Sequence, residues 1–248
     1  MPRPQRPTTT LVVESTEQLT PGMVRVRFTS PDLSAFAEST DTDRYVKLVF
    51  DRADGQVVRT YTALEPDVAA GTVIIDFVVH GTEGVAGPWA AQAKPGDTLS
   101  ARGPGGGYAP DPTADWHLLA GDQAGLPAIR AALAALPAEA VGYAVIDVPS
   151  AEFHQDLVKP DGIELSWLDG ADLVETVRAL PWREGRVHAF VHGEAESVMH
   201  GIRPYLLKER ELPRADVSIS GYWRVGRTEE TFREWKRELA ESEGAGRR

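Results

Sequence analysis

The hydrophobic pattern of this sequence changes once, near residue 112, and that change constrains the fold more than any other feature. Before it, short runs rich in valine, isoleucine, threonine and aromatic residues follow each other closely, and turn clusters such as TPG and DRADG separate them. These runs occupy residues 10–16, 23–30, 44–50, 56–64 and 73–81, and one more strand is expected within residues 94–112. Many short strands at this spacing predict a closed antiparallel barrel.

After residue 112 the predicted strands alternate with helices. Strands are expected at residues 115–121, 140–147, 162–168, 185–193 and 216–223, and helices at residues 126–136, 171–180, 194–210 and 228–241. This alternation implies right-handed crossovers and a parallel sheet. We therefore predict two domains, a β-barrel over residues 1–112 and an α/β domain with a C-terminal helix over residues 113–248. A barrel beside the carboxyl ends of the parallel strands would form one wall of a ligand cleft.

Composition argues against several classes of function. The 248 residues carry a formal net charge of −11, which argues against general binding to nucleic acid or to anionic membranes. The chain has no cysteine, so disulfides, thiolate metal sites and iron–sulfur clusters are excluded. No apolar run approaches the roughly 18 residues of a membrane span, and residues 1–10 lack the apolar core of a secretory signal. We expect a cytoplasmic protein without membrane insertion, and no metal site is predicted.

The stretch Arg59-Thr60-Tyr61-Thr62 places a cation, an aromatic ring and two hydroxyls on one predicted strand. Arg59 and Tyr61 point to one face of such a strand, and the two threonines point to the other. An ordinary edge strand can have this pattern. A dinucleotide site can have it too, because arginine binds two phosphate oxygens and an aromatic ring packs on a flat ligand.

Three further stretches leave predicted strands at positions where loops bind ligands. Residues 76–90 contain a glycine-rich turn whose backbone N–H groups could approach an anion, or a plain connection with Trp89 in the core. In residues 118–129 a buried strand opens a helix, and Asp122 is expected to cap that helix, where its charge would repel phosphate. Residues 220–226 follow the last strand with two aromatic residues and Arg224. Taken singly, each stretch also has a purely structural interpretation.

Taken in order, these stretches resemble the siderophore-interacting protein family, which comprises flavin-dependent ferric-siderophore reductases of the ferredoxin-reductase-like superfamily. The matching segments are YVKLVF, RTYT, DFVVHG with GPWA and GD, LLAGDQAGLPAI, VHGEAE and SGYWRVG, and they span roughly residues 11–236. The resemblance implies a six-stranded FAD-binding barrel followed by an NAD(P)H-binding domain with a parallel sheet. It also implies FAD as cofactor, NADH or NADPH as electron donor, and a ferric siderophore as substrate.

The resemblance carries site residues over position by position. Arg59 matches the flavin phosphate ligand, Tyr61 the residue on the isoalloxazine ring and Thr62 the hydroxyl near its reactive edge. The other residues expected around the flavin are Asp76, Val78, His80, Gly84, Ala86, Gly87 and Trp89. Those expected on the nicotinamide side are Gly121, Asp122, Gln123, Gly193, Glu194, Tyr222 and Trp223. The basic residues expected to attract an anionic siderophore are Lys47, Arg130 and Arg224, and no catalytic acid or base is required beyond the flavin.

The sequence departs from the family pattern in places that leave alternatives open. Leu64 stands where a second arginine is common, and Gln123-Ala124 replaces an acid and a threonine, so nicotinamide handling is in question. The ends of the second and third parallel strands carry acids such as Asp147 and Asp169 and no arginine, which favours NADH over NADPH. A general flavin reductase or electron-transfer flavoprotein, or a siderophore-binding protein without turnover, remain alternatives to the ferric-siderophore reductase.

Overall fold

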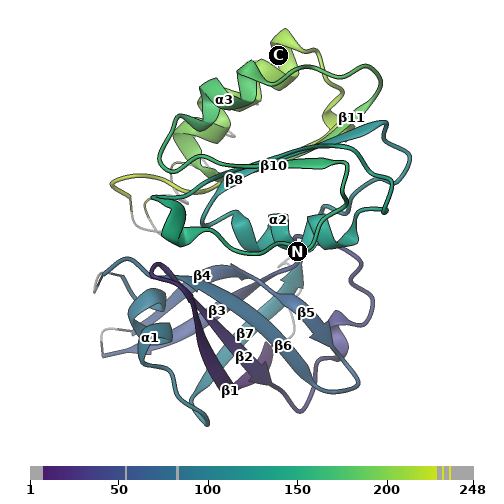
Figure 1. The fold of residues 1–248 in the computed structure, drawn as a ribbon. Helices are drawn as coiled ribbons and strands as arrows, with labels where there is room; N and C mark the ends of the chain where they lie inside the picture. Colours follow the sequence, from purple (N-terminus) through teal and green to yellow (C-terminus); the bar gives the residue numbers. More distant parts are fainter. Residues whose placement is uncertain (1–7, 54, 82–83, 228–230, 232–234, 236–248) are drawn as a thin grey trace, which may run out of the picture.

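The structure, a computed structural model, describes residues 8–53, 55–81, 84–227, 231 and 235. It contains a curled antiparallel sheet and a parallel sheet, which form the lower and upper parts of Figure 1. This is the ferredoxin-reductase-like arrangement that the resemblance implies, so the expected fold class is confirmed. No helix among these described residues has the length and apolar character needed to cross a membrane.

The antiparallel sheet has the strand order β4-β3-β7-β1-β2-β6-β5. Its strands are β1 (Thr8–Thr20), β2 (Met23–Thr29), β3 (Tyr45–Arg52), β4 (Gly55–Thr62), β5 (Leu64–Asp67), β6 (Thr72–Val78) and β7 (Thr98–Gly105). In β2 the alternation of valine and arginine places Val24, Val26 and Phe28 in the barrel core. The short helices η1 (Ser34–Phe36) and α1 (Ala86–Gln92) lie in the connections between strands.

The sheet has seven strands where six were expected, because the strand predicted over residues 56–64 breaks at Ala63. β4 pairs with β3, whereas β5 pairs with β6, so the two edges of the sheet are consecutive in the chain. The backbone N–H of Ala63 donates to the carbonyl oxygen of Arg44 at 2.8 Å, outside both ladders. Leu64 already pairs with β6, and Glu65, with a positive φ of 47°, lies at the register shift between Leu64 and Asp67 within β5. The sheet curls round on itself through this break.

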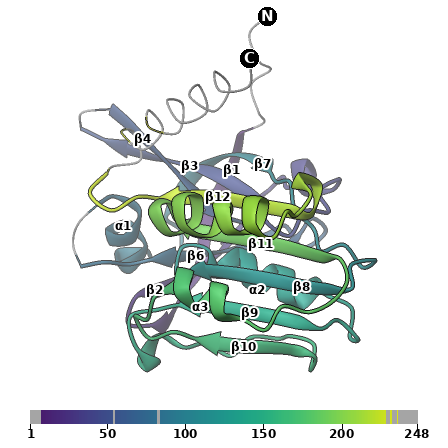
Figure 2. The same ribbon diagram turned by 90° about the horizontal axis from the view of Figure 1, so that it is seen from above.

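The parallel sheet has the strand order β10-β9-β8-β11-β12. Its strands are β8 (Trp116–Asp122), β9 (Gly142–Asp147), β10 (Ile163–Trp167), β11 (Val187–Glu194) and β12 (Val217–Trp223). Helix α2 (Leu126–Ala135) packs on the face toward the barrel, and α3 (Leu173–Ala179) packs on the opposite face (Figures 1 and 2). Because helices cover both faces, the central strands are continuous apolar runs.

The helix expected over residues 194–210 is present, because the chain is helical without a break from residue 195 to residue 209. Two stretches of it have π-helical hydrogen bonding, η3 (Glu196–Ile202) and η4 (Tyr205–Glu209). Two short 3-10 helices, η2 (Ala151–Phe153) and η5 (Arg214–Asp216), complete the set. The helix expected over residues 228–241 lies almost entirely outside the described residues, of which only Thr231 and Trp235 fall in this range.

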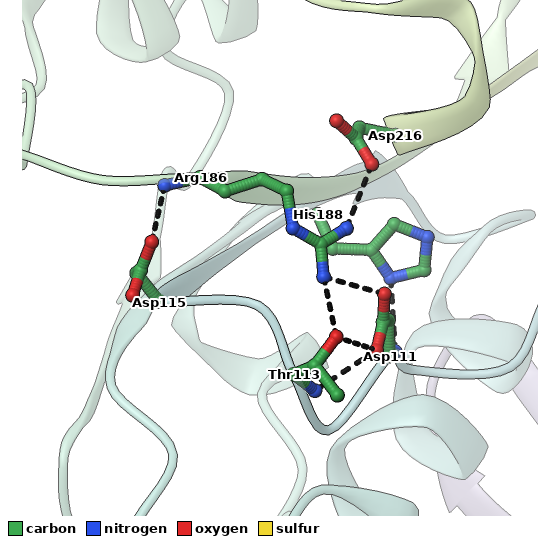
Figure 3. A network of polar contacts seen from close by, with 6 residues as sticks. All are labelled: Asp111, Thr113, Asp115, Arg186, His188 and Asp216. Carbon is green, nitrogen blue, oxygen red and sulfur yellow. Dashed lines mark hydrogen bonds and ion pairs between the residues drawn. The ribbon is translucent and has the colours of Figure 1, made fainter.

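A polar network fastens the segment between the two sheets to the base of the parallel sheet (Figure 3). The Arg186 guanidinium contacts Asp111 at 2.6 Å and Asp216 at 2.8 Å, and its backbone N–H donates to Asp115 at 2.6 Å. The backbone N–H of Asp111 donates to Nδ1 of His188 at 3.1 Å. The boundary proposed near residue 112 falls within this segment, since β7 ends at Gly105 and β8 begins at Trp116.

His117, beside this network, should make the fold sensitive to acid. Burial, and then the charge of His188, lowers the pKa of His117 to about 4, whereas the unfolded chain has about 6.5. Between these values the unfolded state binds more protons, so the free energy of unfolding falls as the pH falls through this window. We expect His117→Gln to remove about 2 kcal/mol of that loss, measured by urea denaturation at pH 7 and pH 4.5. Equal losses in the variant and the parent protein would contradict this assignment.

Candidate functional site

A cleft of about 830 Å³ lies between the barrel and the carboxyl edge of the parallel sheet. Strands β3, β4 and β6 contribute one wall. The other wall consists of the carboxyl ends of β8, β9 and β12 and the segments that follow β8, β9 and β10. The lining residues are Tyr45, Lys47, Arg59, Thr60, Tyr61, Thr62, Asp76, Val78, His80, Asp122, Gln123, Ala124, Pro127, Asp147, Val148, Pro149, Gly170, Ser220, Tyr222 and Trp223. The cleft predicted at the junction of the two domains is therefore present.

The cleft brings together many of the predicted site residues from both halves of the chain. They are Lys47, Arg59, Tyr61, Thr62, Asp76, Val78, His80, Asp122, Gln123, Tyr222 and Trp223. Nine others do not line it, namely Gly84, Ala86, Gly87, Trp89, Gly121, Arg130, Gly193, Glu194 and Arg224. The functional roles of the residues that line the cleft stay proposals. The residues that do not line it are described below by the contacts that they make instead.

The end of β4 forms the barrel wall of the cleft. All four residues from Arg59 to Thr62 line it, because the strand ends at Thr62 and side chains of both faces reach the opening. The ring of Tyr61 packs on Phe77 with centroids 4.6 Å apart, so the barrel core fixes its orientation. Nη1 of Arg59 donates to the carbonyl oxygen of Val58 at 3.0 Å. The strand thus presents a cation, a ring and hydroxyls at one position.

Asp76, predicted as a cofactor contact, is held by an arginine of the neighbouring strand. Nε and Nη2 of Arg25 donate to its two carboxylate oxygens at 2.7 Å and 2.8 Å, across the ladder between β2 and β6. Hydrogen bonds to Asp76 raise the pKa of Arg25. The pair neutralises the carboxylate within the cleft wall, so it does not repel a phosphate group there. The sequence analysis did not identify Arg25, because strand pairing is not visible in the sequence.

Glycines lie in the turn before α1 and in the first turn of this helix. A Cβ at Gly87, the second residue of α1, would lie 3.0 Å from the carbonyl oxygen of Val78, so a larger residue there would require the two backbones to move apart. Gly84 takes a positive φ of 82° and borders a smaller hollow of about 470 Å³ on the barrel. Trp89 packs among core aromatics, including Phe28, whose ring centroid is 6.2 Å away. Trp89 is therefore half-buried against the barrel core, and its predicted contact with a ligand stays a proposal.

Asp122 ties together the ends of three parallel strands. Its carboxylate accepts hydrogen bonds from the backbone N–H groups of Ala124 at 2.8 Å, Gly125 at 3.1 Å and Glu194 at 2.8 Å, and from Nε1 of Trp223 at 2.7 Å. Burial raises the pKa of Asp122, and the four N–H donors oppose that rise because they stabilise the ionised form. The expectation that Asp122 caps α2 is corrected, because Gly125 is the N-cap residue and Asp122 lies before it.

Two predicted glycines allow this clamp to form. A Cβ at Gly121 would lie 2.3 Å from the carbonyl oxygen of His192. A Cβ at Gly193 would lie 2.9 Å from the carboxylate of Asp122. Both distances are far below an ordinary contact, so side chains there would separate the ends of β8 and β11. The structure therefore gives these two glycines a packing role beside the cleft.

Two of the three predicted basic residues are engaged away from the cleft. Nη2 of Arg224 donates to Glu196 at 2.9 Å, and its guanidinium lies 4.6 Å from the ring centre of Trp235. Arg130 on α2 donates to Gln155, and burial lowers its pKa. The sequence predicted that Arg130 and Arg224 face the cleft. In the structure their side chains are oriented by partners from other segments of the chain. Of the three, Lys47 lines the cleft.

Comparison with known proteins agrees with both halves of this geometry. The family model described as "Siderophore-interacting FAD-binding domain" matches residues 12–58 and 50–108, and "Siderophore-interacting protein" matches residues 114–226. An uncharacterised protein of Mycobacterium tuberculosis is 44% identical over 96% of this chain and 98% of its own length. The ferric vibriobactin reductase ViuB of Vibrio cholerae is 32% identical and covers 89% of this chain, which covers 91% of ViuB.

A solved structure supports the same relationship at the level of the fold. A siderophore utilization protein from T. fusca is 34% identical, with a TM-score of 0.77 over 90% of this chain and 94% of that chain. At this coverage the alignment extends over both the antiparallel and the parallel sheet. The chain belongs to the siderophore-interacting protein family, whose N-terminal domain binds FAD.

Proposed function

We propose that this protein is a flavin-dependent reductase that passes electrons from NADH through FAD to a ferric siderophore and so releases ferrous iron. The observation that carries the proposal is the cleft, in which Arg59, Tyr61 and Thr62 of a FAD-binding domain face Asp122 and Trp223 of the second domain. The likeness to a ferric vibriobactin reductase over 89% of the chain supports the reaction class.

The charges of the cleft suit FAD on one wall and a nicotinamide nucleotide without a 2′-phosphate on the other. The cations that line it, Lys47 and Arg59, stand on the barrel wall, where the carboxylate of Asp76 is already paired with Arg25. Among the described residues that line the opposite wall are Asp122 and Asp147 but no lysine or arginine. Phosphate groups therefore favour the barrel wall, because opposite charges attract most strongly at short range in a partly enclosed site. The residues present fit FAD.

The chain's own residues bind and orient the reacting groups. Arg59 would hold a phosphate of FAD, Tyr61 would pack on the flavin ring, and Thr62 would supply a hydroxyl at its edge. FAD, when bound, supplies the transfer of electrons from a nicotinamide to single-electron acceptors. The protein adds position and electrostatics, so no acid or base residue is required. Reduction lowers the charge on iron and weakens its attraction to the anionic oxygens of the chelator.

Lys47 is proposed to attract the anionic substrate. It lines the cleft, and Arg102 lies directly opposite it on β7 without lining the cleft. This pair offers a matched test of charge at the cleft against charge beside it. We expect Lys47→Gln to raise KM for an anionic ferric siderophore about five-fold at low salt, since an exposed charge contributes about 1 kcal/mol. Arg102→Gln should raise KM less than two-fold.

The measurement is NADH-driven release of ferrous iron, followed with a ferrous-specific chelator. Raising the ionic strength should reduce the difference between Lys47→Gln and the parent protein, because salt screens exposed charges. Equal effects of the two substitutions would contradict a substrate role for Lys47. No turnover with any ferric siderophore, together with NADH-driven reduction of free flavins, would favour the general flavin reductase. The general flavin reductase is considered because Arg130 and Arg224, which were predicted to attract the siderophore, do not line the cleft.

A further inference from the structure

Asp147 lies at the cleft with fewer hydrogen bonds than its neighbour Asp122 accepts. It is the last residue of β9 and pairs in parallel register with Asp122 of β8. Both acids line the cleft. Asp122 accepts four hydrogen bonds. Asp147 accepts a backbone hydrogen bond from Gly170, while its Oδ1 is buried and has no hydrogen-bond partner within the part of the chain that the structure describes. One oxygen of the Asp147 carboxylate is therefore left without a donor.

A buried carboxylate oxygen without a donor in a cleft wall suggests a ligand that brings donors. Leaving a buried polar atom without a partner costs about 1–3 kcal/mol, so such groups need an explanation. Burial, and then the charge of Asp122, raises the pKa of Asp147. A ligand with hydroxyl donors would satisfy the carboxylate, whereas a ligand with a phosphate at this position would add a further negative charge. The chemistry of the group therefore selects for hydroxyls.

The residues around Asp147 also favour a ligand with hydroxyl groups over a ligand with a phosphate. The α/β wall of the cleft includes no lysine or arginine among its lining residues. Asp172 caps α3 by accepting from the backbone N–H groups of Val174 and Glu175, and Asp169 pairs with His154 at 2.6 Å. Gly170, which also lines the cleft, would meet nothing closer than 3.8 Å with a Cβ, so the wall beside Asp147 is open.

We propose that Asp147 accepts hydrogen bonds from the ribose hydroxyls of the adenosine half of the electron donor, and that it thereby selects NADH over NADPH. An acid at the end of a parallel strand suits a ribose diol, and an arginine is needed there for a 2′-phosphate. The inference rests on the proposed function, because it assumes that a nicotinamide nucleotide occupies this wall. It goes further by naming the residue that distinguishes the two donors.

The test compares two ligands that differ by one phosphate and need no turnover. ADP-ribose and 2′-phospho-ADP-ribose are titrated into the FAD-loaded protein by calorimetry. The parent protein should bind ADP-ribose at least ten-fold more tightly. Asp147→Asn keeps the shape of the side chain but removes its charge. It should lower the ratio of the affinities for ADP-ribose and 2′-phospho-ADP-ribose at least ten-fold. The ratio of kcat/KM for flavin reduction by NADH and by NADPH should fall by a similar factor, with an unchanged flavin spectrum.

Asp169→Asn is the matched control, because Asp169 is an acid at the same sheet edge that does not line the cleft. It should leave the ratio within two-fold of the parent protein. An unchanged ratio in Asp147→Asn, or an equal change in Asp169→Asn, would overturn the proposal. So would an equal loss of affinity for nicotinamide mononucleotide, because Asp147 would then contact the other ribose. A protein that retains FAD but binds neither ADP-ribose nor NADH overturns this inference, whereas one that never retains FAD overturns the proposed function.

Discussion

Asp122→Ala should lower the free energy of unfolding by about 4 kcal/mol, the largest loss expected from a single substitution at this cleft. The substitution removes the common acceptor of four N–H donors that come from three different strand ends. Water can reach only some of these donors, so several would remain unsatisfied in the folded state. Asp122→Asn keeps one side-chain oxygen and should cost about half as much.

Asp172→Ala is the matched control for this prediction. Asp172 also accepts two backbone N–H bonds, but it does so as the exposed N-cap of α3. Its loss should cost about 1 kcal/mol, as is typical for a helix cap. Urea denaturation of the three variants and the parent protein measures the order. If Asp122→Ala cost no more than Asp172→Ala, Asp122 would not act as a clamp between strands.

Arg59→Ala should weaken FAD binding about 100-fold and leave the free energy of unfolding of the flavin-free protein within about 1 kcal/mol. The expected loss corresponds to the charge-assisted hydrogen bonds that a guanidinium makes with phosphate. Arg59→Lys keeps the charge but lacks the planar fork, so its affinity should lie between those of the other two proteins. Quenching of flavin fluorescence during titration measures the dissociation constants.

Arg102→Ala is the control for general positive charge on the barrel. Arg102 is exposed on β7 and does not line the cleft. It should change FAD affinity less than three-fold. An Arg59→Ala variant that purifies with a full complement of flavin would show that the cation of β4 does not hold the phosphate.

The fold could be predicted largely from the sequence because local patterns and global packing agree in it. Alternating residues in β2 and continuous apolar residues in β8 reflect sheets covered on one and on two faces. The break at Ala63 could not be predicted. At this position the backbone of Ala63 bonds to Arg44, a residue of a distant segment, instead of joining a strand ladder.

The candidate site could be predicted where a ligand-facing residue lies within a local motif. RTYT and the turn containing Asp122 both reach the cleft, as do Tyr222 and Trp223. The positions of the basic side chains were harder to predict, because the orientation of a long charged side chain depends on its tertiary contacts. Glu196 and Trp235 engage Arg224, and Gln155 engages Arg130, and no sequence motif connects these partners. The Arg25–Asp76 pair was missed for the same reason.

The most direct test of the proposed reaction separates electron transfer to iron from reduction by the donor. FAD-loaded protein is reduced with one equivalent of NADH without oxygen, and is then mixed with a ferric siderophore and a ferrous-specific chelator. The flavin absorbance should recover while two ferrous complexes form for each flavin, because a reduced flavin carries two electrons and each ferric ion takes one. A flavin that stays reduced while no ferrous complex forms would contradict the assignment of this protein as a ferric-siderophore reductase.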